Sequence, residues 1–121
     1  MLNCILVGIG GFIGTILRYL IGLLPIKVEN GFPVKTLLIN VVGAFLIGLI
    51  GALAAKNKNF NPQLVLMLRV GVCGGFTTFS TFAYESVDLI RGGNSAAAFC
   101  YICVSVILGV GAVFAAQMIV K

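Results

Sequence analysis

Four long apolar segments, separated by short polar stretches, determine most of what this chain can fold into. The segments cover residues 4–24, 37–55, 63–90 and 96–120 of a chain of 121 residues. A helix of about 20 apolar residues spans the hydrocarbon core of a bilayer. We therefore predict an all-α integral membrane protein, a single transmembrane domain over residues 1–121 with four transmembrane helices and no soluble domain.

The composition leaves little for enzymatic chemistry. Charged residues make up 9% of the chain, histidine is absent, and the acidic residues are Glu29, Glu85 and Asp88. Zinc sites, Ser-His-Asp triads and most proton relays therefore lack the residues that they need. The net charge of +5 comes from scattered Lys and Arg rather than from a basic cluster, so nucleic acid is not expected as a partner. We predict that the protein is not an enzyme.

The basic residues near the membrane edges give no preferred orientation. Four lie on each side of a four-span chain: Arg18, Lys27, Lys35 and Arg91 on one side, and Lys56, Lys58, Arg69 and Lys121 on the other. Because the Lys and Arg distribution sets orientation, a balanced chain can insert both ways. Two opposed copies would then form an antiparallel, dual-topology homodimer about a two-fold axis in the membrane plane. The alternative is a single orientation set by features that this count does not capture.

Glycine pairs predict close helix packing. Gly10 and Gly14 in the first segment, and Gly71 and Gly75 in the third, have the G-x-x-x-G spacing with which helix backbones approach one another in lipid. The four cysteines lie in apolar runs, and we expect them to be small buried hydrophobic residues rather than disulfide partners.

The stretch GGFTTFSTF, Gly74 to Phe82, interrupts the apolar pattern of the third segment. Two glycines followed by two β-branched threonines make a plausible break near the middle of this helix. Backbone carbonyls freed at a break could coordinate a small hard cation between two opposed chains. The alternative is an unbroken helix in which the threonine hydroxyls bond back to the preceding turn.

Rings and hydroxyls follow in helical register. Phe79 and Phe82 share one face, and Thr78, Thr81 and Glu85 form a polar stripe beside them. The edge of a phenyl ring carries partial positive charge, so ring edges along a pore would attract an anion. Ordinary packing of the two rings is the alternative, and Glu85 is either the mouth of a pathway or the wet end of the helix.

Four further residues extend this interpretation. Asn40 can donate hydrogen bonds from its amide, and Tyr101 and Ser105 align on one face of the fourth segment, so the three could line an anion pathway. Arg18, several residues inside the first segment, could attract an anion into a vestibule. Asn40 could instead link helices, Tyr101 could lie at the membrane interface, and Arg18 could extend to the membrane surface.

Three stretches of the sequence resemble the signature regions of the Fluc/CrcB fluoride channel family. They are GGFIGTILRY (Gly10 to Tyr19), TLLINVVGAFLIG (Thr36 to Gly48) and GVCGGFTTFSTFAYE (Gly71 to Glu85), in that order and over nearly the whole chain. The first departs slightly, with Thr15 where an alanine is usual. The resemblance implies a dual-topology antiparallel homodimer that passively exports fluoride across a bacterial inner membrane and relieves its toxicity.

The resemblance also implies roles for individual residues. Asn40 matches the pore asparagine, Phe79 and Phe82 match the phenylalanines of the fluoride path, Ser80 and Thr81 match its hydroxyl track, and Tyr101 and Ser105 match positions on the fourth span. Gly74 and Thr77 match the residues whose carbonyls, from both subunits, hold a structural sodium ion (Na+). The partners implied are fluoride, sodium, a second copy of the chain and the lipid bilayer.

A proton-coupled exporter like the small multidrug resistance proteins is the rival interpretation. Such a protein needs a carboxylate within the membrane to bind its cations. The first segment carries Arg18 and no acid, and Glu85 comes late in the third segment, so the sequence favours the fluoride channel.

Overall fold

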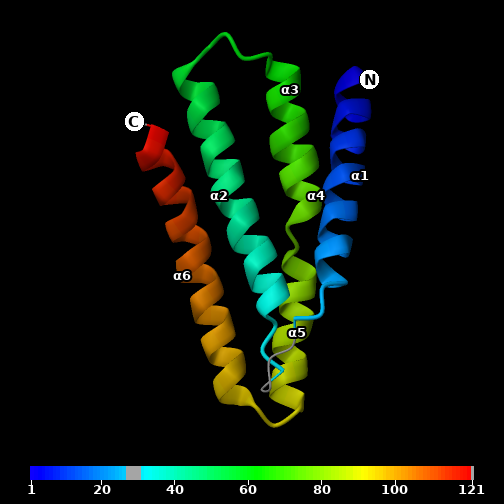
Figure 1. The fold of residues 1–121 in the computed structure, drawn as a ribbon, viewed down its shortest axis with the longest axis vertical. Helices are drawn as coiled ribbons and strands as arrows, with labels where there is room; N and C mark the ends of the chain where they lie inside the picture. Colours follow the sequence, from blue (N-terminus) through cyan, green and yellow to red (C-terminus); the bar gives the residue numbers. More distant parts are fainter. Residues whose placement is uncertain (27–30, 121) are drawn as a thin grey trace.

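Four long helical segments form an elongated bundle in which both termini lie at the same end (Figure 1). The computed structural model describes residues 1–26 and 31–120, and this part of the chain contains no strand. The segments Leu2–Gly22, Val34–Lys56, Pro62–Arg91 and Ser95–Val120 are long and apolar enough to cross a membrane. The all-helical prediction with four spans is therefore confirmed. Lys27 and Lys121, which entered the charge count, lie outside the described residues.

Helix α1 (Leu2–Gly22) packs closely on the third segment, along the helices α3 (Pro62–Leu66), η1 (Met67–Cys73) and α4 (Gly74–Phe76). A Cβ at Gly10 would lie 2.5 Å from the Met67 carbonyl oxygen, and one at Gly75 would lie 2.6 Å from the Gly11 oxygen. Only glycine allows this approach of backbones. The close packing predicted from the glycine spacing is confirmed.

Helix α2 (Val34–Lys56) pairs with α6 (Ser95–Val120), and the two lie side by side along their length (Figure 1). Gly48 is buried at this contact, where an added Cβ would lie 3.0 Å from the Val113 Cα atom and 3.3 Å from the Ala116 Cβ atom. Ala98 and Ala116 are buried as well. Small residues thus hold both helix pairs together.

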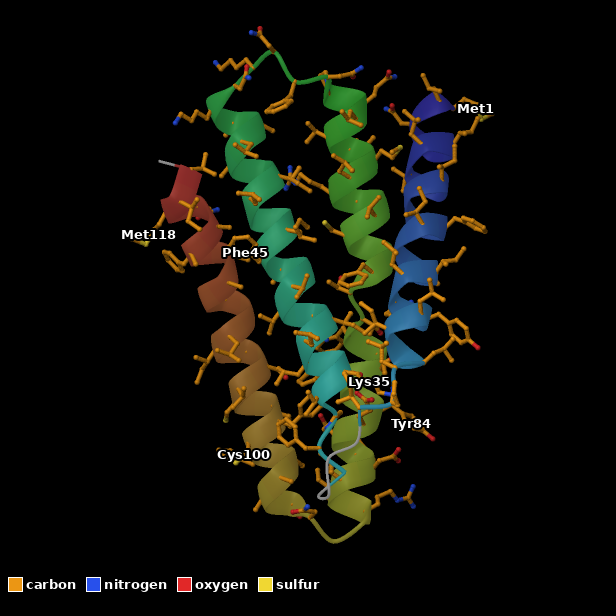
Figure 2. All side chains as sticks on the ribbon, in the orientation of Figure 1. Met1, Lys35, Phe45, Tyr84, Cys100 and Met118 are labelled. Carbon is orange, nitrogen blue, oxygen red and sulfur yellow. The ribbon has the colours of Figure 1, made fainter. Side chains whose placement is uncertain are left out.

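Short capping contacts set the helix ends. Asn61 caps α3, its side chain accepting a hydrogen bond of 2.8 Å from the Gln63 N–H, and Pro62 occupies the first helical position. Lys35, at the start of α2 beside the end of α1 (Figure 2), donates to the Gly22 and Leu24 carbonyls at 2.8 and 3.3 Å. Such contacts satisfy the carbonyls that a helix end leaves without partners.

The third segment is bent rather than straight. Helix η1 is a π-helix, a form that often marks functional sites. After α4 the chain passes through two extended residues before α5 (Phe79–Arg91) continues towards the opposite end of the bundle, as Figure 1 shows. The segment then ends at Gly92 and at Gly93, whose φ of +84° favours glycine.

Most large apolar side chains point outwards, as expected for a chain in contact with lipid or with a second chain (Figure 2). The expectation that the cysteines are buried is wrong for Cys4 and Cys100, which are exposed, whereas Cys73 is buried. A cysteine's position in an apolar run does not show whether it is buried or exposed, because the lipid-facing side of a membrane helix is apolar too.

Candidate functional site

The site is built around the bend between α4 and α5. Thr77 (φ −82°, ψ 158°) and Thr78 (φ −149°, ψ 117°) have extended backbone. The Thr77 N–H donates to the Cys73 carbonyl at 3.0 Å, and its hydroxyl donates to the same oxygen at 2.9 Å. The back-bonding considered for an unbroken helix therefore occurs at Thr77, at the last helical turn before the extended residues.

Asn40, in the second turn of α2, both accepts a hydrogen bond from the backbone of Thr78 and donates one to it. Its Oδ1 accepts from the Thr78 N–H at 2.8 Å, and its Nδ2 donates to the Thr78 carbonyl at 3.0 Å. Asn40 thus replaces helical hydrogen bonds for a residue that has left the helix. In the single chain it acts as the helix-to-helix link that was the alternative interpretation of this residue.

Arg18 and Thr15 reach the same bend from α1. The Arg18 Nε–H donates to the Gly75 carbonyl at 3.2 Å, and the Thr15 hydroxyl donates to it at 3.5 Å. Arg18 therefore bonds to protein backbone inside the bundle, and its side chain also lines an open cavity of about 470 Å³ together with Tyr19, Lys35 and Glu85. An Arg18 side chain that only extended to the membrane surface would make neither contact.

The Gly74 carbonyl loses its usual partner at the bend. In a continuous helix it would accept from the Thr78 N–H, which donates to Asn40 instead. Gly74 is exposed in the single chain, and the extended residues Thr77 and Thr78 follow at the end of its helical turn. An accessible carbonyl without a helical donor is a suitable ligand for a hard cation.

The donor set at the bend fits sodium better than a transition metal. In residues 1–26 and 31–120 no three His, Cys, Asp or Glu side chains gather into a metal site, so a cation here would bind carbonyl oxygens. Thr77, the second predicted ligand, is held against α2, where its methyl group occupies the space that a side chain at Gly43 would fill. The backbone of Thr77 is therefore tightly positioned.

Aromatic rings form a row from α5 to α6. The Phe79 and Phe82 ring centroids are 5.8 Å apart, and the Phe82 and Tyr101 centroids are 5.1 Å apart in an edge-to-face arrangement. Phe32 packs edge-to-face on the other side of Tyr101 at 5.5 Å. Phe79 is 78% exposed, while Tyr101 is fully buried. The row thus runs into the core from the exposed surface around Phe79, which we call the open face of the chain.

Hydroxyl groups accompany the rings and meet at Glu85. The Thr78 hydroxyl donates to that of Thr81 at 3.0 Å and accepts from the Thr81 N–H at 3.2 Å. Thr36 and Tyr101 each donate to a Glu85 carboxylate oxygen at 3.0 Å. Through Glu85 the polar stripe predicted on α5 is therefore connected to α2 and α6. Glu85 also lines the open cavity that contains Arg18.

Two predicted residues of the fluoride pathway, Ser105 and Ser80, lie apart from this network. The Ser105 hydroxyl is buried and has no hydrogen-bond partner within the described residues. Ser80 is exposed on α5 next to Phe79. Ser105 retains a free donor inside the protein, and Ser80 offers one on the open face of the chain.

A second open cavity, of about 290 Å³, connects several of the predicted residues. It is lined by Asn40, Gly43, Ala44, Ile47, Cys73, Thr77, Thr78, Phe79 and Phe82. The bend, Asn40 and both phenylalanines thus meet around one hollow on the surface of the chain. Gly74 lies next to this group in sequence, and Tyr101 adjoins Phe82.

The sequence interpretation missed several residues that support the site. Thr36, Asn40 and Gly43 recur at helical spacing and share one face of α2, and this spacing could have identified Thr36 and Gly43. Thr15 similarly lies one turn before Arg18. Phe32 and the π-helical form of η1 carry no comparable signal in the sequence.

The chain is similar to known proteins over nearly its whole length. The family model described as "CrcB-like protein, Camphor Resistance (CrcB)" matches residues 5–117. The chain is 41% identical over 121 residues to a fluoride-specific ion channel FluC of Chlorobaculum tepidum, covering 100% of this chain and 96% of that protein. It is 42% identical over 122 residues to the fluoride-specific ion channel FluC of Ruminiclostridium cellulolyticum, covering 100% and 94% of the two chains. The FluC channel of Agrobacterium fabrum is 42% identical over 116 residues, covering 95% and 93%.

Proposed function

Because this chain belongs to the CrcB family, whose relatives named above are fluoride-specific ion channels, we propose that it conducts fluoride passively across a membrane and so relieves fluoride toxicity. The observation that carries the proposal is the row of rings from Phe79 through Phe82 to Tyr101, which runs beside hydroxyl groups into the core of the chain. The protein is a multi-pass membrane protein, and we place it in the inner membrane of a bacterium.

The chemistry of the row suits a small, strongly hydrated anion. Fluoride gives up its water only where several donors and positive ring edges converge on a narrow route. Ser80, Thr81 and Ser105 supply hydroxyls, and Asn40 retains one amide hydrogen beyond its bond to Thr78. Because these groups are uncharged, they bind the anion without trapping it, and the larger chloride ion is rejected by size.

The proposed channel is an antiparallel, dual-topology homodimer. Phe79, Ser80 and Gly74 are exposed in the single chain, although they lie in a span. A backbone carbonyl and a hydroxyl facing hydrocarbon would each be costly. A second copy in the opposite orientation would cover this face, and the balanced Lys and Arg count permits that orientation.

A sodium ion at the centre of this dimer would complete the covered face. The Gly74 and Thr77 carbonyls of both copies would hold it, and the ion would supply the positive charge that joins the two chains. The loss of the helical partner of Gly74 supports this assignment. Fluoride itself is the transported ion, and no proton is needed for its movement.

Purified protein in liposomes loaded with potassium fluoride tests the function. A fluoride electrode outside the liposomes should record rapid efflux when valinomycin lets potassium follow, and no comparable efflux of chloride should appear. A protein that released neither ion, or both equally, would contradict the proposal.

The same liposomes distinguish a channel from the rival proton-coupled exporter. Fluoride efflux should continue at the same rate without a pH gradient, because the row of neutral donors offers no step that consumes a proton. Glu85, the carboxylate within the bundle, is engaged by Thr36 and Tyr101, which argues against its use as a cation-binding site. Efflux that required a proton gradient would favour the exporter.

A further inference from the structure

Arg18 makes a contact that the conduction of fluoride does not by itself require. Its Nε–H donates to the Gly75 carbonyl at 3.2 Å, near the end of the helical part of the third segment that precedes the bend. In a continuous helix that carbonyl would accept from the N–H of Phe79. Phe79 instead begins α5, beyond the two extended threonines.

The contact has a clear physical purpose at this place. Carbonyls at the end of a helix lack intrahelical donors, and in a membrane such groups must be satisfied by other parts of the protein. The Arg18 Nε–H comes from a neighbouring helix and supplies such a donor to the Gly75 carbonyl. The Thr15 hydroxyl, at 3.5 Å from the same oxygen, is a weaker second donor.

Arg18 and Asn40 hold the two sides of the bend from different helices. Arg18 comes from α1 and binds Gly75 before the extended residues, whereas Asn40 comes from α2 and binds Thr78 within them. If the Gly75 carbonyl were released, it could take the Phe79 N–H and shift the threonines and the Gly74 carbonyl from their present places.

We propose that Arg18 is a positioning residue that keeps the third segment open between α4 and α5, and that it acts through its Nε–H bond to Gly75 rather than through its charge. The inference deepens the proposed function and rests on it where sodium is concerned, because the position of the Gly74 carbonyl would set sodium affinity. The effect on the backbone itself does not depend on the sodium site.

Two nearly isosteric substitutions separate the hydrogen bond from the charge. In Arg18→Gln the side-chain amide nitrogen falls at the same place along the chain as the arginine Nε, so the donor is kept and the charge is lost. In Arg18→Met a methyl group falls there, so both are lost. Arg18→Lys keeps the charge and places its ammonium group one atom further out.

The first measurement is hydrogen exchange of peptides covering residues 74–82 in the purified protein. Loss of this hydrogen bond should speed exchange in Arg18→Met by about tenfold, with Arg18→Gln within about twofold of wild type. The second is equilibrium binding of radioactive sodium to the purified protein at constant ionic strength. Half-saturation should need about tenfold more sodium in Arg18→Met than in wild type or Arg18→Gln. A general loss of stability would lower the amount of sodium bound without moving this midpoint.

Several results would overturn the inference. One is that Arg18→Gln and Arg18→Met show the same exchange rates and the same sodium midpoint. Another is that Arg18→Lys matches wild type in both measurements while Arg18→Gln does not. If Arg18→Met does not fold, Arg18→Gln decides: wild-type exchange and sodium midpoint support the inference, and altered values refute it. Wild-type protein that conducts no fluoride would refute the proposed function instead, and the exchange comparison would still test Arg18.

Discussion

Asn40 and Thr78 exchange two hydrogen bonds, in which the Asn40 amide satisfies both the N–H and the carbonyl of a single extended residue. This is the arrangement of a short strand pairing, made here by a side chain. The pairing also affects Gly74, one turn earlier in the chain. In a continuous helix the Thr78 N–H would donate to the Gly74 carbonyl, but here it donates to Asn40. The residue that resembles the pore asparagine thus also exposes a proposed sodium ligand.

Asn40→Asp tests this relationship. When ionised, at alkaline pH, the aspartate keeps an acceptor for the Thr78 N–H but cannot donate to the Thr78 carbonyl, and it places two acceptors face to face. We expect the free energy of unfolding to fall by about 1–3 kcal/mol and fluoride efflux to fall with it. Thermal unfolding in detergent and the fluoride electrode measure the two effects. Asn59→Asp, in the exposed turn between α2 and α3, is the control and should be silent in both; a silent Asn40→Asp would refute the role of the pair.

Phe79→Ile should nearly abolish fluoride efflux while the protein remains folded and elutes in the same oligomeric state as wild type. Phe79 is 78% exposed in the single chain, so its replacement should change the stability of the monomer fold by no more than about 0.5 kcal/mol. Isoleucine keeps an apolar side chain but has no positive ring edge for the anion. Efflux from liposomes and size-exclusion chromatography give the two readings.

The matched control for this substitution is Phe99→Ile on α6, at another residue that is 68% exposed. It should conduct as wild type does. Wild-type efflux from Phe79→Ile would remove Phe79 from the pathway, and equal losses in both variants would point to a general effect of ring removal on the membrane protein.

The sequence was sufficient to predict the class of fold, because hydrocarbon thickness fixes the length of an apolar helix and little else can occupy the chain. Glycine spacing predicted the close packing of α1 on the third segment for a similar reason, since backbone approach depends on the missing Cβ. These features follow from local composition.

The contacts within the site were less predictable. Helical spacing placed Thr78, Thr81 and Glu85 on one face, but no periodicity within one helix indicates that Thr36 and Tyr101 meet Glu85 from two other helices. Asn40 and Arg18 were interpreted as residues of an anion pathway, and in the single chain both also bind backbone at the bend, which their spacing did not indicate. Which of several partners a polar side chain takes is decided by tertiary geometry, which the spacing of residues does not contain.

Gly43→Ala should weaken the proposed sodium site. An added Cβ would collide with the Thr77 methyl group and press on the backbone that carries a proposed ligand. Overpacking of this kind costs about 1–3 kcal/mol, and we expect a higher sodium concentration at half-saturation of sodium binding. Gly8→Ala, where nothing lies within 4 Å, is the control and should leave the sodium midpoint unchanged. An unchanged midpoint in Gly43→Ala would contradict the assignment of Thr77.

Ser105→Ala should separate stability from conduction. The Ser105 hydroxyl is buried without a partner in the described residues, and an unpaired buried hydroxyl costs about 1–3 kcal/mol. Its removal should therefore leave thermal stability unchanged or raise it.

If the hydroxyl donates to passing fluoride, the same substitution should lower efflux by about tenfold, since a hydrogen bond to a charged group is lost. Ser86→Ala is the opposite case, because the Ser86 hydroxyl donates to the Phe82 carbonyl at 2.8 Å and its loss should lower stability. Wild-type efflux from a Ser105→Ala protein of unaltered stability would exclude Ser105 from the fluoride path.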